Sequence, residues 1–434
     1  MCGILYSQDS TGFTDLEMLK RRGPEGFTES ENDLGYFAHS MLNTVGESTP
    51  QPYHTGSGIL LYNGSTYNSG KENDTKWIGE KLDSNIDNTV DVVRELNGEY
   101  AFIYVTEKNV VFCVDHFDNR NLWIYHDKDS HQLTLASVPN VINQKHKNSC
   151  RADGGNIYIM DRHDFSLTMV VNRVFNLDQK INNFDHVFEQ FEQAILSRYR
   201  PGLTANTLSS GFDSGVVACA THKIFGGVDC VSDPHKEVID TLKERIALHK
   251  GVVITNQQGH QKDKEEMFHG ILPNDLWDDP VVNPMINLIK RYFVKNSKKI
   301  VMTGAGGDEI YNDSHKQKKG HQWTRTNGSF PSSLQLVWPW YKQNPRLQRS
   351  LTRSDFIAGY FGLETRNPLL DVNLVQAWLN TTSTLKNSYK SWIKAYFDQE
   401  KYPYSMTKVH AFHDPYEMDA WKVAENDSGE TFVS

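Results

Sequence analysis

Residues 204–215, TANTLSSGFDSG, join a short β-prone run to a Ser/Gly turn and a helix start. Residues 204–208 favour a strand, and residues 214–223 favour a helix. Backbone N–H groups at such a turn attract anions, and Asp213 adds a carboxylate of the kind that Mg²⁺ accepts. Ser/Gly-rich loops are also often plain turns, so this stretch indicates the fold before it indicates a ligand.

Short apolar runs and helical patterns alternate on both sides of this stretch. The alternation predicts a doubly wound α/β domain with a parallel sheet over residues 180–434, helical from about residue 332 and ending in a loose tail at 425–434. The other expected strands are 228–231, 252–255 and 300–303, and the other expected helices are 237–249 and 285–295. A helix with one apolar face is also expected at Val187, Phe191, Ala194 and Ile195.

The chain before residue 170 has a different pattern, with short β-rich runs between Asn, Asp and Gly clusters. It predicts a first domain over residues 2–170 built of layered sheets with few helices, joined to the second by polar residues 172–184. The expected strands are 58–62, 100–105, 110–114, 132–137 and 156–160, and the expected helices are 15–21 and 77–82.

Bulk properties favour a soluble protein of 434 residues, with 38% hydrophobic and 23% charged residues. The net charge of -9 is spread along the chain, so no nucleic-acid partner is expected. No apolar run approaches the roughly 20 residues that span a membrane, and the first residues do not resemble a secretory signal. The five cysteines form no CxxC pair, so we expect neither zinc nor disulfides and a cytoplasmic protein; a homodimer is compatible with all of this.

Cys2 directly follows the initiator methionine. Removal of Met1 would give Cys2 a free α-amine with an ordinary pKa near 8, which can serve as the base for its own thiol. A cysteine at position 2 can equally be there by chance. Asn63-Gly64, further along, can likewise be no more than a hairpin turn.

Taken in order, the segments MCGI (1–4), RRGP (21–24), AH (38–39), YNGSTYN (62–68), ND (73–74) and LNGEYAF (96–102) resemble the class II glutamine amidotransferases. The resemblance implies an Ntn-hydrolase-like domain in which Cys2 attacks the amide of glutamine. It further implies an oxyanion hole at Asn63 and Gly64, and a glutamine site that also includes Ser65 and Asp74. Two positions depart from the family: Met41 replaces an arginine that pairs with the glutamine carboxylate, and Ser65 replaces a glutamate.

Three later segments resemble the ATP-using half of the glutamine-hydrolysing asparagine synthetases. Residues 209–214 resemble the pyrophosphate loop SGGxDS of N-type ATP pyrophosphatases, with Ser210 for the first glycine. Residues 303–309, TGAGGDE, resemble SGEGxDE, and residues 362–371, GLETRNPLLD, resemble GxExRxPFLD. The chain is therefore identified as a short, divergent member of this family, whose second domain has an adenine nucleotide alpha hydrolase-like fold.

The family resemblance implies the cofactors ATP and Mg²⁺, with Asp213 and Asp308 as metal ligands. It implies acceptor-site candidates at Glu309, Glu364 and Arg366. The implied ATP and pyrophosphate contacts are Leu208, Ser209, Ser210, Gly211, Asp213, Ser214, Val231, Thr303, Gly304 and the catalytic Lys408.

The implied reaction hydrolyses glutamine, transfers ammonia to the second site and amidates an adenylated carboxylate, with aspartate as the favoured acceptor. Ala305 departs from the family, which has a glutamate there for handling ammonia. The alternatives are amidation or cyclisation of another carboxylate, use of free ammonia with a degenerate glutaminase half, and a nucleotide-binding regulatory module without catalysis.

Overall fold

The computed structural model describes residues 1–10, 13, 16–44, 46–70, 73–85, 88–126, 132–139, 141, 149–233, 237–253, 264, 267–268, 274–277, 279, 281–311, 329–343, 346–406, 424–425 and 431–432. The chain forms two compact units. The first comprises Met1–Val174, Gly270–Pro273 and Leu351–Thr365, and the second comprises Phe175–His269, Asn274–Ser350 and Arg366–Ser434.

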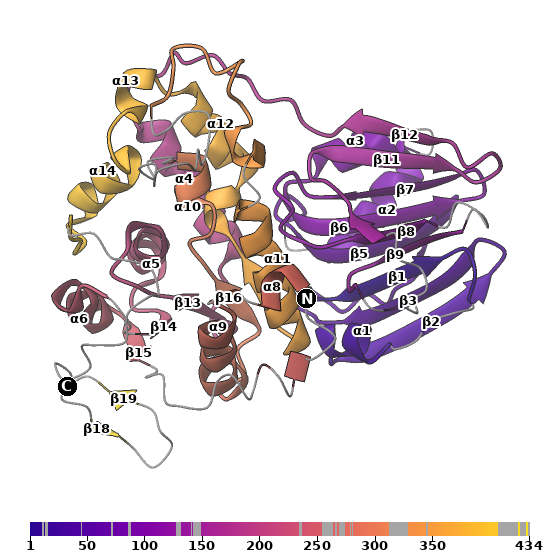
Figure 1. Cartoon of the computed structure of the whole chain (residues 1–434), viewed down its shortest axis with the longest axis horizontal. Coiled ribbons are helices and arrows are strands. Elements are labelled where there is room, and N and C mark those ends of the chain that lie inside the picture. The colour runs from indigo at the N-terminus through magenta and orange to yellow at the C-terminus, as the bar shows by residue number, and fades with distance from the viewer. Residues whose placement is uncertain are drawn as a thin grey trace. The chain divides into compact units, whose positions relative to one another are not determined.

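The first unit contains two antiparallel sheets (Figure 1). One has the order β10-β8-β9-β1-β3-β2, and the other has the order β12-β11-β7-β6-β5-β4. The strands are β1 (Gly3–Ser7), β2 (Gly26–Asn32), β3 (Gly35–Met41), β4 (Tyr53–His54), β5 (Gly58–Thr66), β6 (Gly98–Thr106), β7 (Asn109–Val114), β8 (Trp123–His126), β9 (Leu133–Ala136), β10 (Ser149–Arg151), β11 (Asn156–Asp161) and β12 (Leu167–Val171).

Alternating side chains of these strands build two apolar layers. Leu61 of β5 lies in a cluster with Ile4 and Phe37, which fills the space between the sheets. Its neighbour Leu60 points to the other face and packs in a cluster with Ile78 of α2. The helices of this unit are α1 (Glu17–Arg22), α2 (Asp74–Ser84) and α3 (Thr89–Glu95), so the unit is layered from helices and sheets.

The second unit is organised around a mainly parallel sheet with the order β17-β16-β13-β14-β15-β19-β18. Strand β13 pairs in parallel with β14 on one side and with β16 on the other. The strand order therefore reverses beside β13, which is where open α/β sheets bind ligands. The strands are β13 (Thr204–Thr207), β14 (Asp229–Ser232), β15 (Lys250–Val253), β16 (Ile300–Met302), β17 (Glu364–Arg366), β18 (Ala424–Glu425) and β19 (Thr431–Phe432).

Helices separate most of these strands along the chain (Figure 1). The α-helices are α4 (Asp185–Arg198), α5 (Phe212–Phe225), α6 (Ile239–Leu248), α8 (Asn274–Trp277), α9 (Val282–Leu288), α10 (Gly307–Tyr311), α11 (Arg346–Tyr360), α12 (Val372–Asn380), α13 (Ser383–Lys386) and α14 (Ser391–Glu400). A π-helical segment covers Ile289–Val294, and 3₁₀ turns cover Trp340–Gln343 and Pro368–Leu370. None of the helices in the described ranges is long and apolar enough to cross a membrane.

Most predicted elements are confirmed, with end positions shifted by a few residues. The layered antiparallel sheets, the later parallel sheet and the helical C-terminal part are all present. In the first unit the sequence pattern missed β1, β2, β3, β4, β8, β10, β12 and α3. The prediction of a loose tail at 425–434 is wrong for its described residues, because β19 pairs with β15, where Val253 lies opposite Thr431. A sheet edge offers unpaired backbone groups, and they pair with this segment despite its polar sequence.

Residues Leu351–Thr365 belong to the first unit, although they come late in the chain. Within that unit, Nη1 and Nη2 of Arg22 donate to the carboxylate of Asp355, each at 3.1 Å. Each side chain is only 1% exposed, so the pair is fully desolvated. Asn121 also donates to Asp355 at 2.8 Å, which satisfies the carboxylate further.

Replacing Asp355 with alanine should leave the Arg22 guanidinium buried without its counter-charge. We expect the free energy of unfolding of the first unit to fall by about 3–5 kcal/mol, measured by urea titration. The matched control is Glu95→Ala, which breaks the exposed Lys81–Glu95 pair and should cost no more than about 1 kcal/mol. Equal losses in the two variants would contradict the assignment of Arg22–Asp355 as a buried pair.

Candidate functional site

Cys2 lies immediately before β1, which pairs with β3 so that Gly3 is opposite Ser40. The Ser40 hydroxyl accepts from the Gly3 N–H at 2.9 Å and fixes the start of the strand. The Leu42 N–H donates to Cys2 Sγ at 3.4 Å, and Sγ is 3.6 Å from the Leu42 carbonyl oxygen. Burial raises the pKa of the Cys2 thiol, while the nearby α-amino charge lowers it. The thiol therefore needs a base before it can react as a thiolate.

Met1 is fully buried in the first unit when it is present. Its α-ammonium donates to the Leu363 carbonyl at 2.8 Å, and Arg22 Nη2 lies 3.6 Å from its sulfur. Burial lowers the pKa of this α-amine to about 5. With Met1 in place, the Cys2 nitrogen is a peptide N–H and cannot act as a base.

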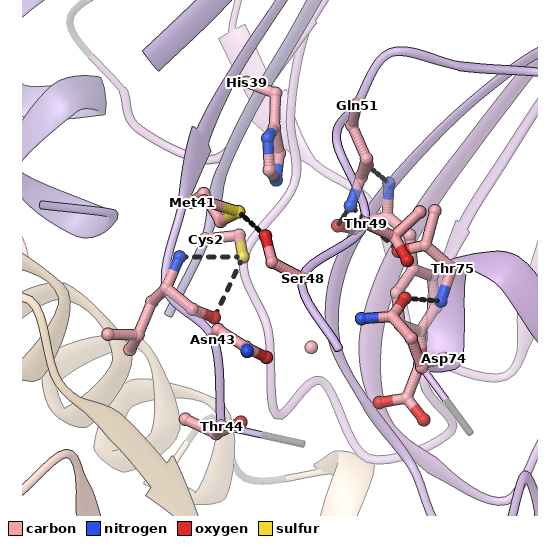
Figure 2. Close-up of a pocket in the computed structure, with 14 residues that line it drawn as sticks. Cys2, His39, Met41, Asn43, Thr44, Ser48, Thr49, Gln51, Asp74 and Thr75 are labelled. Atoms are coloured by element: carbon pink, nitrogen blue, oxygen red, sulfur yellow. Dashed lines mark hydrogen bonds between the residues drawn. The ribbon is translucent and has the colours of Figure 1, made fainter. Parts of the chain in front are cut away.

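An open cavity lies beside Cys2 (Figure 2). In Figure 2 the Cys2 sulfur and the Asp74 carboxylate lie on different sides of it. All the lining residues belong to the first unit. They are Cys2, His39, Met41, Leu42, Asn43, Thr44, Ser48, Thr49, Gln51, Tyr62, Gly64, Asn73, Asp74 and Thr75.

Asp74 is the first residue of α2, and its buried carboxylate accepts from the Ser69 hydroxyl at 2.7 Å. The side chain of Asn73 caps the helix by accepting from the N–H groups of Thr75 and Lys76. A carboxylate in the first turn is favoured by the helix dipole. The cavity therefore has an acidic group of fixed position in one wall.

The predicted oxyanion pair lies within β5 and not in a hairpin turn. Gly64 has φ +143°, and a Cβ there would lie 2.0 Å from the Glu99 carbonyl oxygen, so only glycine fits. Gly64 lines the cavity, whereas Asn63 is not among the described residues that do so. The Asn63 amide nitrogen is 3.3 Å from the Ser137 hydroxyl oxygen, and the side chain is fully buried. The role of Asn63 as an oxyanion donor stays a prediction.

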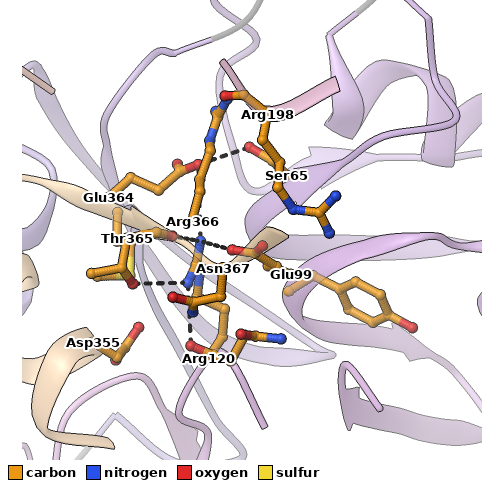
Figure 3. Close-up of polar contacts among 12 residues, drawn as sticks. Ser65, Glu99, Arg120, Arg198, Asp355, Glu364, Thr365, Arg366 and Asn367 are labelled. Atoms are coloured by element: carbon orange, nitrogen blue, oxygen red, sulfur yellow. Dashed lines mark hydrogen bonds and ion pairs between the residues drawn. The ribbon is translucent and has the colours of Figure 1, made fainter. Parts of the chain in front are cut away.

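Ser65 is not among the described residues that line the cavity, and its hydroxyl donates to Glu364 at 3.0 Å (Figure 3). Glu364 belongs to the same unit and lies 3.9 Å from Arg120, which is 3.5 Å from Glu99. All of these side chains are buried, so Glu364 is one member of a desolvated charge cluster. The hydroxyl of Thr44, a residue that lines the cavity, is 3.4 Å from Glu364.

The sequence motifs assign no role to two residues of the cavity, His39 and Met41. His39 is buried, its Nε2 has no hydrogen-bond partner among the described residues, and burial lowers its pKa to about 4. The imidazole is therefore neutral at physiological pH. Met41 accepts from the Ser48 hydroxyl, with Oγ 2.8 Å from its sulfur. The side chain at position 41 is thus neutral and already in contact with the wall.

In the second unit, side chains accept hydrogen bonds from the backbone of the loop after β13. The N–H groups of Ser209 and Gly211 donate to Ser214 Oγ and Ser209 Oγ, both at 3.1 Å. The Ser210 N–H donates to a carboxylate oxygen of Glu237 at 2.5 Å. A carboxylate therefore occupies the loop at the start of α5, which shows that this backbone accepts an anion.

Arg245 donates hydrogen bonds to backbone carbonyl groups of the same loop. Its Nη1 donates to the carbonyl oxygens of Ser209 at 2.6 Å and Gly211 at 2.7 Å. A Cβ at position 215 would lie 2.3 Å from Arg245 Nη1, so Gly215 makes room for the guanidinium. No motif in the sequence singled out Arg245 or Glu237.

Asp213 and Asp308 converge on one ammonium group, that of Lys390. The Nζ of Lys390 is 2.5 Å from Asp213 Oδ1 and 2.7 Å from Asp308 Oδ1, and this lysine side chain is 2% exposed. Burial and the neighbouring carboxylate of Asp308 raise the pKa of Asp213 to about 7, against the effect of Lys390. Burial opposes the charge of Lys390, but the two carboxylates raise its pKa. The three groups form one electrostatic unit, and the sequence analysis missed its lysine.

Two glycines allow the loop after β16 to approach the loop after β13. A Cβ on Gly304 would lie 2.4 Å from the backbone of Asp213, and a Cβ on Gly307 would lie 2.2 Å from the Asp213 carboxyl carbon. Neither contact is sterically possible, so these positions require glycine. The close approach places the two predicted metal ligands on adjoining loops.

The other predicted residues of this unit are placed as follows. Leu208 donates through its N–H to the carbonyl oxygen of Val231, at 2.8 Å, and Val231 is buried. Thr303 donates its hydroxyl to Asn367 at 2.6 Å. Arg366 is fully buried and donates to the Arg198 carbonyl at 2.6 Å.

Glu309 is 3.5 Å from Arg346, and burial followed by the charge of Asp308 raises its pKa. Lys408 lies outside the described residues. A group of three or more metal-ligating side chains does not occur among the described residues. Mg²⁺ commonly binds through only one or two carboxylates together with substrate phosphates, so the Asp213–Asp308 pair fits that ion.

No protein-family model matches the sequence, and no curated protein matches it. Two similar solved structures are the glutamine phosphoribosylpyrophosphate (PRPP) amidotransferase from B. subtilis complexed with ADP and GMP, and a protein described as the allosteric regulatory enzyme of purine biosynthesis. Their identities are 13% and 14%, and both TM-scores are 0.32. The matches cover 54% of this chain and 65% of the first, and 72% of this chain and 76% of the second. Likeness at this TM-score supports no conclusion about activity.

The buried N-terminus leads to a prediction about processing. We expect the mature protein to begin at Cys2, because a small second residue permits removal of Met1 and removal frees the α-amine that the thiol needs. Mass spectrometry of the N-terminal peptide measures this, and a Cys2→Leu variant, which should retain Met1, is the control. Full retention of Met1 in a protein that hydrolyses glutamine would show that the α-amine of Cys2 is not the base.

Proposed function

We propose that the chain is an ATP-dependent amidotransferase, a glutamine-hydrolysing enzyme of the asparagine synthetase type. The observation that carries the proposal is the convergence of Asp213 and Asp308 on Lys390 at the carboxyl ends of β13 and β16. Acidic groups on adjoining loops, beside a reversal of strand order, suit a nucleotide with its metal. The cavity at Cys2 supports a separate amide-hydrolysing site.

In the first reaction, Cys2 Sγ attacks the side-chain amide carbon of glutamine, and its proton passes to the α-amine. The C–N bond breaks, ammonia leaves and a thioester remains. Water then hydrolyses the thioester to glutamate and restores the thiol. The backbone N–H of Gly64, which lines the cavity, is the best-placed candidate to stabilise the oxyanion, and Asn63 would join it through a rotation of its amide.

In the second reaction, an acceptor carboxylate attacks the α-phosphorus of ATP and pyrophosphate leaves. Ammonia then attacks the acyl-adenylate, which gives the amide and AMP. The loop from Ser209 to Ser214 would bind the phosphates at the position where Glu237 now contacts Ser210. Asp213 and Asp308 would hold Mg²⁺, which when bound neutralises phosphate charge. Lys390 adds a positive charge at the same place.

The identity of the acceptor rests on resemblance, and aspartate is the expected one. Ala305 cannot transfer a proton to or from ammonia. Glu309 is the acidic residue that follows the predicted metal ligand Asp308, and burial raises its pKa above that of an ordinary carboxyl group, which favours a role in proton transfer. A different acceptor carboxylate is the second candidate, and the alanine is the observation that favours it.

Replacing Cys2 with serine tests the donor half. Glutamine-dependent amide formation should fall at least about 10³-fold, because serine is not activated at this site, while synthesis from ammonium chloride should be unchanged. Cys150→Ser, which alters an exposed thiol of the same unit, should affect neither reaction. If Cys2→Ser leaves the glutamine-dependent rate intact, the first unit is not a cysteine-dependent glutaminase.

Replacing Asp213 with asparagine tests the second half. Exchange of labelled pyrophosphate into ATP, in the presence of aspartate and Mg²⁺, should fall by about 10²-fold or more, because a group that holds the metal-bound phosphates is lost. The exposed Asp178→Asn in the same unit should exchange normally.

Wild-type protein should be assayed in parallel with a panel of carboxylates. If another acid stimulates the exchange and aspartate does not, the proposed reaction becomes amidation of that acid and not asparagine synthesis. Absence of exchange with every acid would favour a nucleotide-binding regulatory module.

A further inference from the structure

The cavity beside Cys2 has an unusual charge balance for a site that is to bind a free amino acid. Among its fourteen described lining residues, Asp74 is the only one that has an acidic or basic side chain charged at neutral pH. His39 is neutral there, because burial lowers its pKa to about 4. Among the side chains of these fourteen residues, a free α-amine would therefore meet a counter-charge and a free carboxylate would meet none.

The neutral amide donors of the wall are already engaged by the protein. The side-chain nitrogen of Gln51 is 3.0 Å from both the Tyr62 carbonyl and the Thr75 hydroxyl oxygens. The side-chain nitrogens of Asn43 and Asn73 donate to backbone carbonyls at 3.1 and 2.9 Å. A ligand carboxylate would have to break these bonds to gain hydrogen bonds from these three amides.

Two backbone donors of the wall are engaged as well. The Asn43 N–H donates to Glu25 at 2.6 Å, and the Leu42 N–H donates to Cys2 Sγ. In the first turn of α2, the Asn73 side chain already accepts from the N–H groups of Thr75 and Lys76. The helix end therefore presents the Asp74 carboxylate and not its own free donors.

We infer that the cavity selects an amide donor that carries a free α-amine but no free α-carboxylate, as a glutamine residue at the N-terminus of a peptide does. This inference rests on the proposed glutaminase function of Cys2 and specifies its substrate class. The α-amine would pair with Asp74, and the peptide carbonyl would lie along the neutral wall at Met41 and Ser48. The chemistry at the side-chain amide is that of glutamine hydrolysis: Sγ displaces ammonia, and water releases the γ-carboxylate.

The test compares two donors that differ only in the α-carboxyl group. L-Glutamine α-N-methylamide has a single primary amide, so ammonia release reports the γ-position alone. We expect its kcat/KM for ammonia release, with purified full-length protein, to exceed that of L-glutamine by about tenfold or more, since a carboxylate without a partner costs at least that factor.

The matched variants are Met41→Arg and Met41→Leu. Arginine would give the wall a bidentate carboxylate partner and should shift the preference toward L-glutamine by about tenfold or more, while leucine should leave the preference unchanged. Each result is a ratio within one variant, so partial loss of folded protein does not alter it.

Cys2-dependent hydrolysis that favours L-glutamine over the methylamide in the wild type would overturn this inference and leave the proposed glutaminase standing. Hydrolysis of neither donor would overturn both.

Discussion

The second unit depends on a buried ammonium group between two carboxylates. Asp213 and Asp308 would repel each other if they met alone in a desolvated place, and Lys390 offsets that repulsion from within hydrogen-bond distance of both. The arrangement is held by backbone as well as by charge, since Gly304 and Gly307 leave no room for a side chain against Asp213. Removing the lysine would leave two partly buried like charges side by side, which favours separation of the loops or uptake of a proton or a metal ion.

The topology of the sheet explains why these loops meet. Strand β13 has β14 on one side and β16 on the other, so the chain leaves β13 in one direction and returns to its opposite edge almost a hundred residues later. The carboxyl ends of the two adjacent strands then carry the two acidic loops. Two further side chains hold the loop after β13. Arg245 donates to a backbone carbonyl group of this loop, and Glu237 accepts from the Ser210 N–H.

The sequence predicted those elements that depend only on residues close together in the chain. The strand, turn and helix around Asp213 and the glycine-rich segment around Asp308 were recognisable, because phosphate-binding turns require small residues at fixed spacing. Lys390 was not recognisable, because it lies 177 residues after Asp213 and its surrounding sequence resembles an ordinary helix start. Asn63-Gly64 resembles a hairpin turn in sequence, yet it lies inside a nine-residue strand where the Glu99 backbone passes too close for any side chain. Long-range packing decides such positions, and a single sequence does not record it.

The sequence also did not predict that the segment Leu351–Thr365 belongs to the first unit. Its polar groups are used inside the first unit: the Leu363 carbonyl accepts from the Met1 amine, Glu364 accepts from Ser65, and the Thr365 carbonyl accepts from Arg120 at 2.9 Å. The next residue, Arg366, belongs to the second unit, where its carbonyl accepts from the Thr303 N–H at 3.0 Å. Moving Glu364 away would remove one of the two carboxylates near the buried Arg120, and a buried charge that loses a partner is costly. The charge cluster therefore holds Glu364 and Thr365 in place within the first unit.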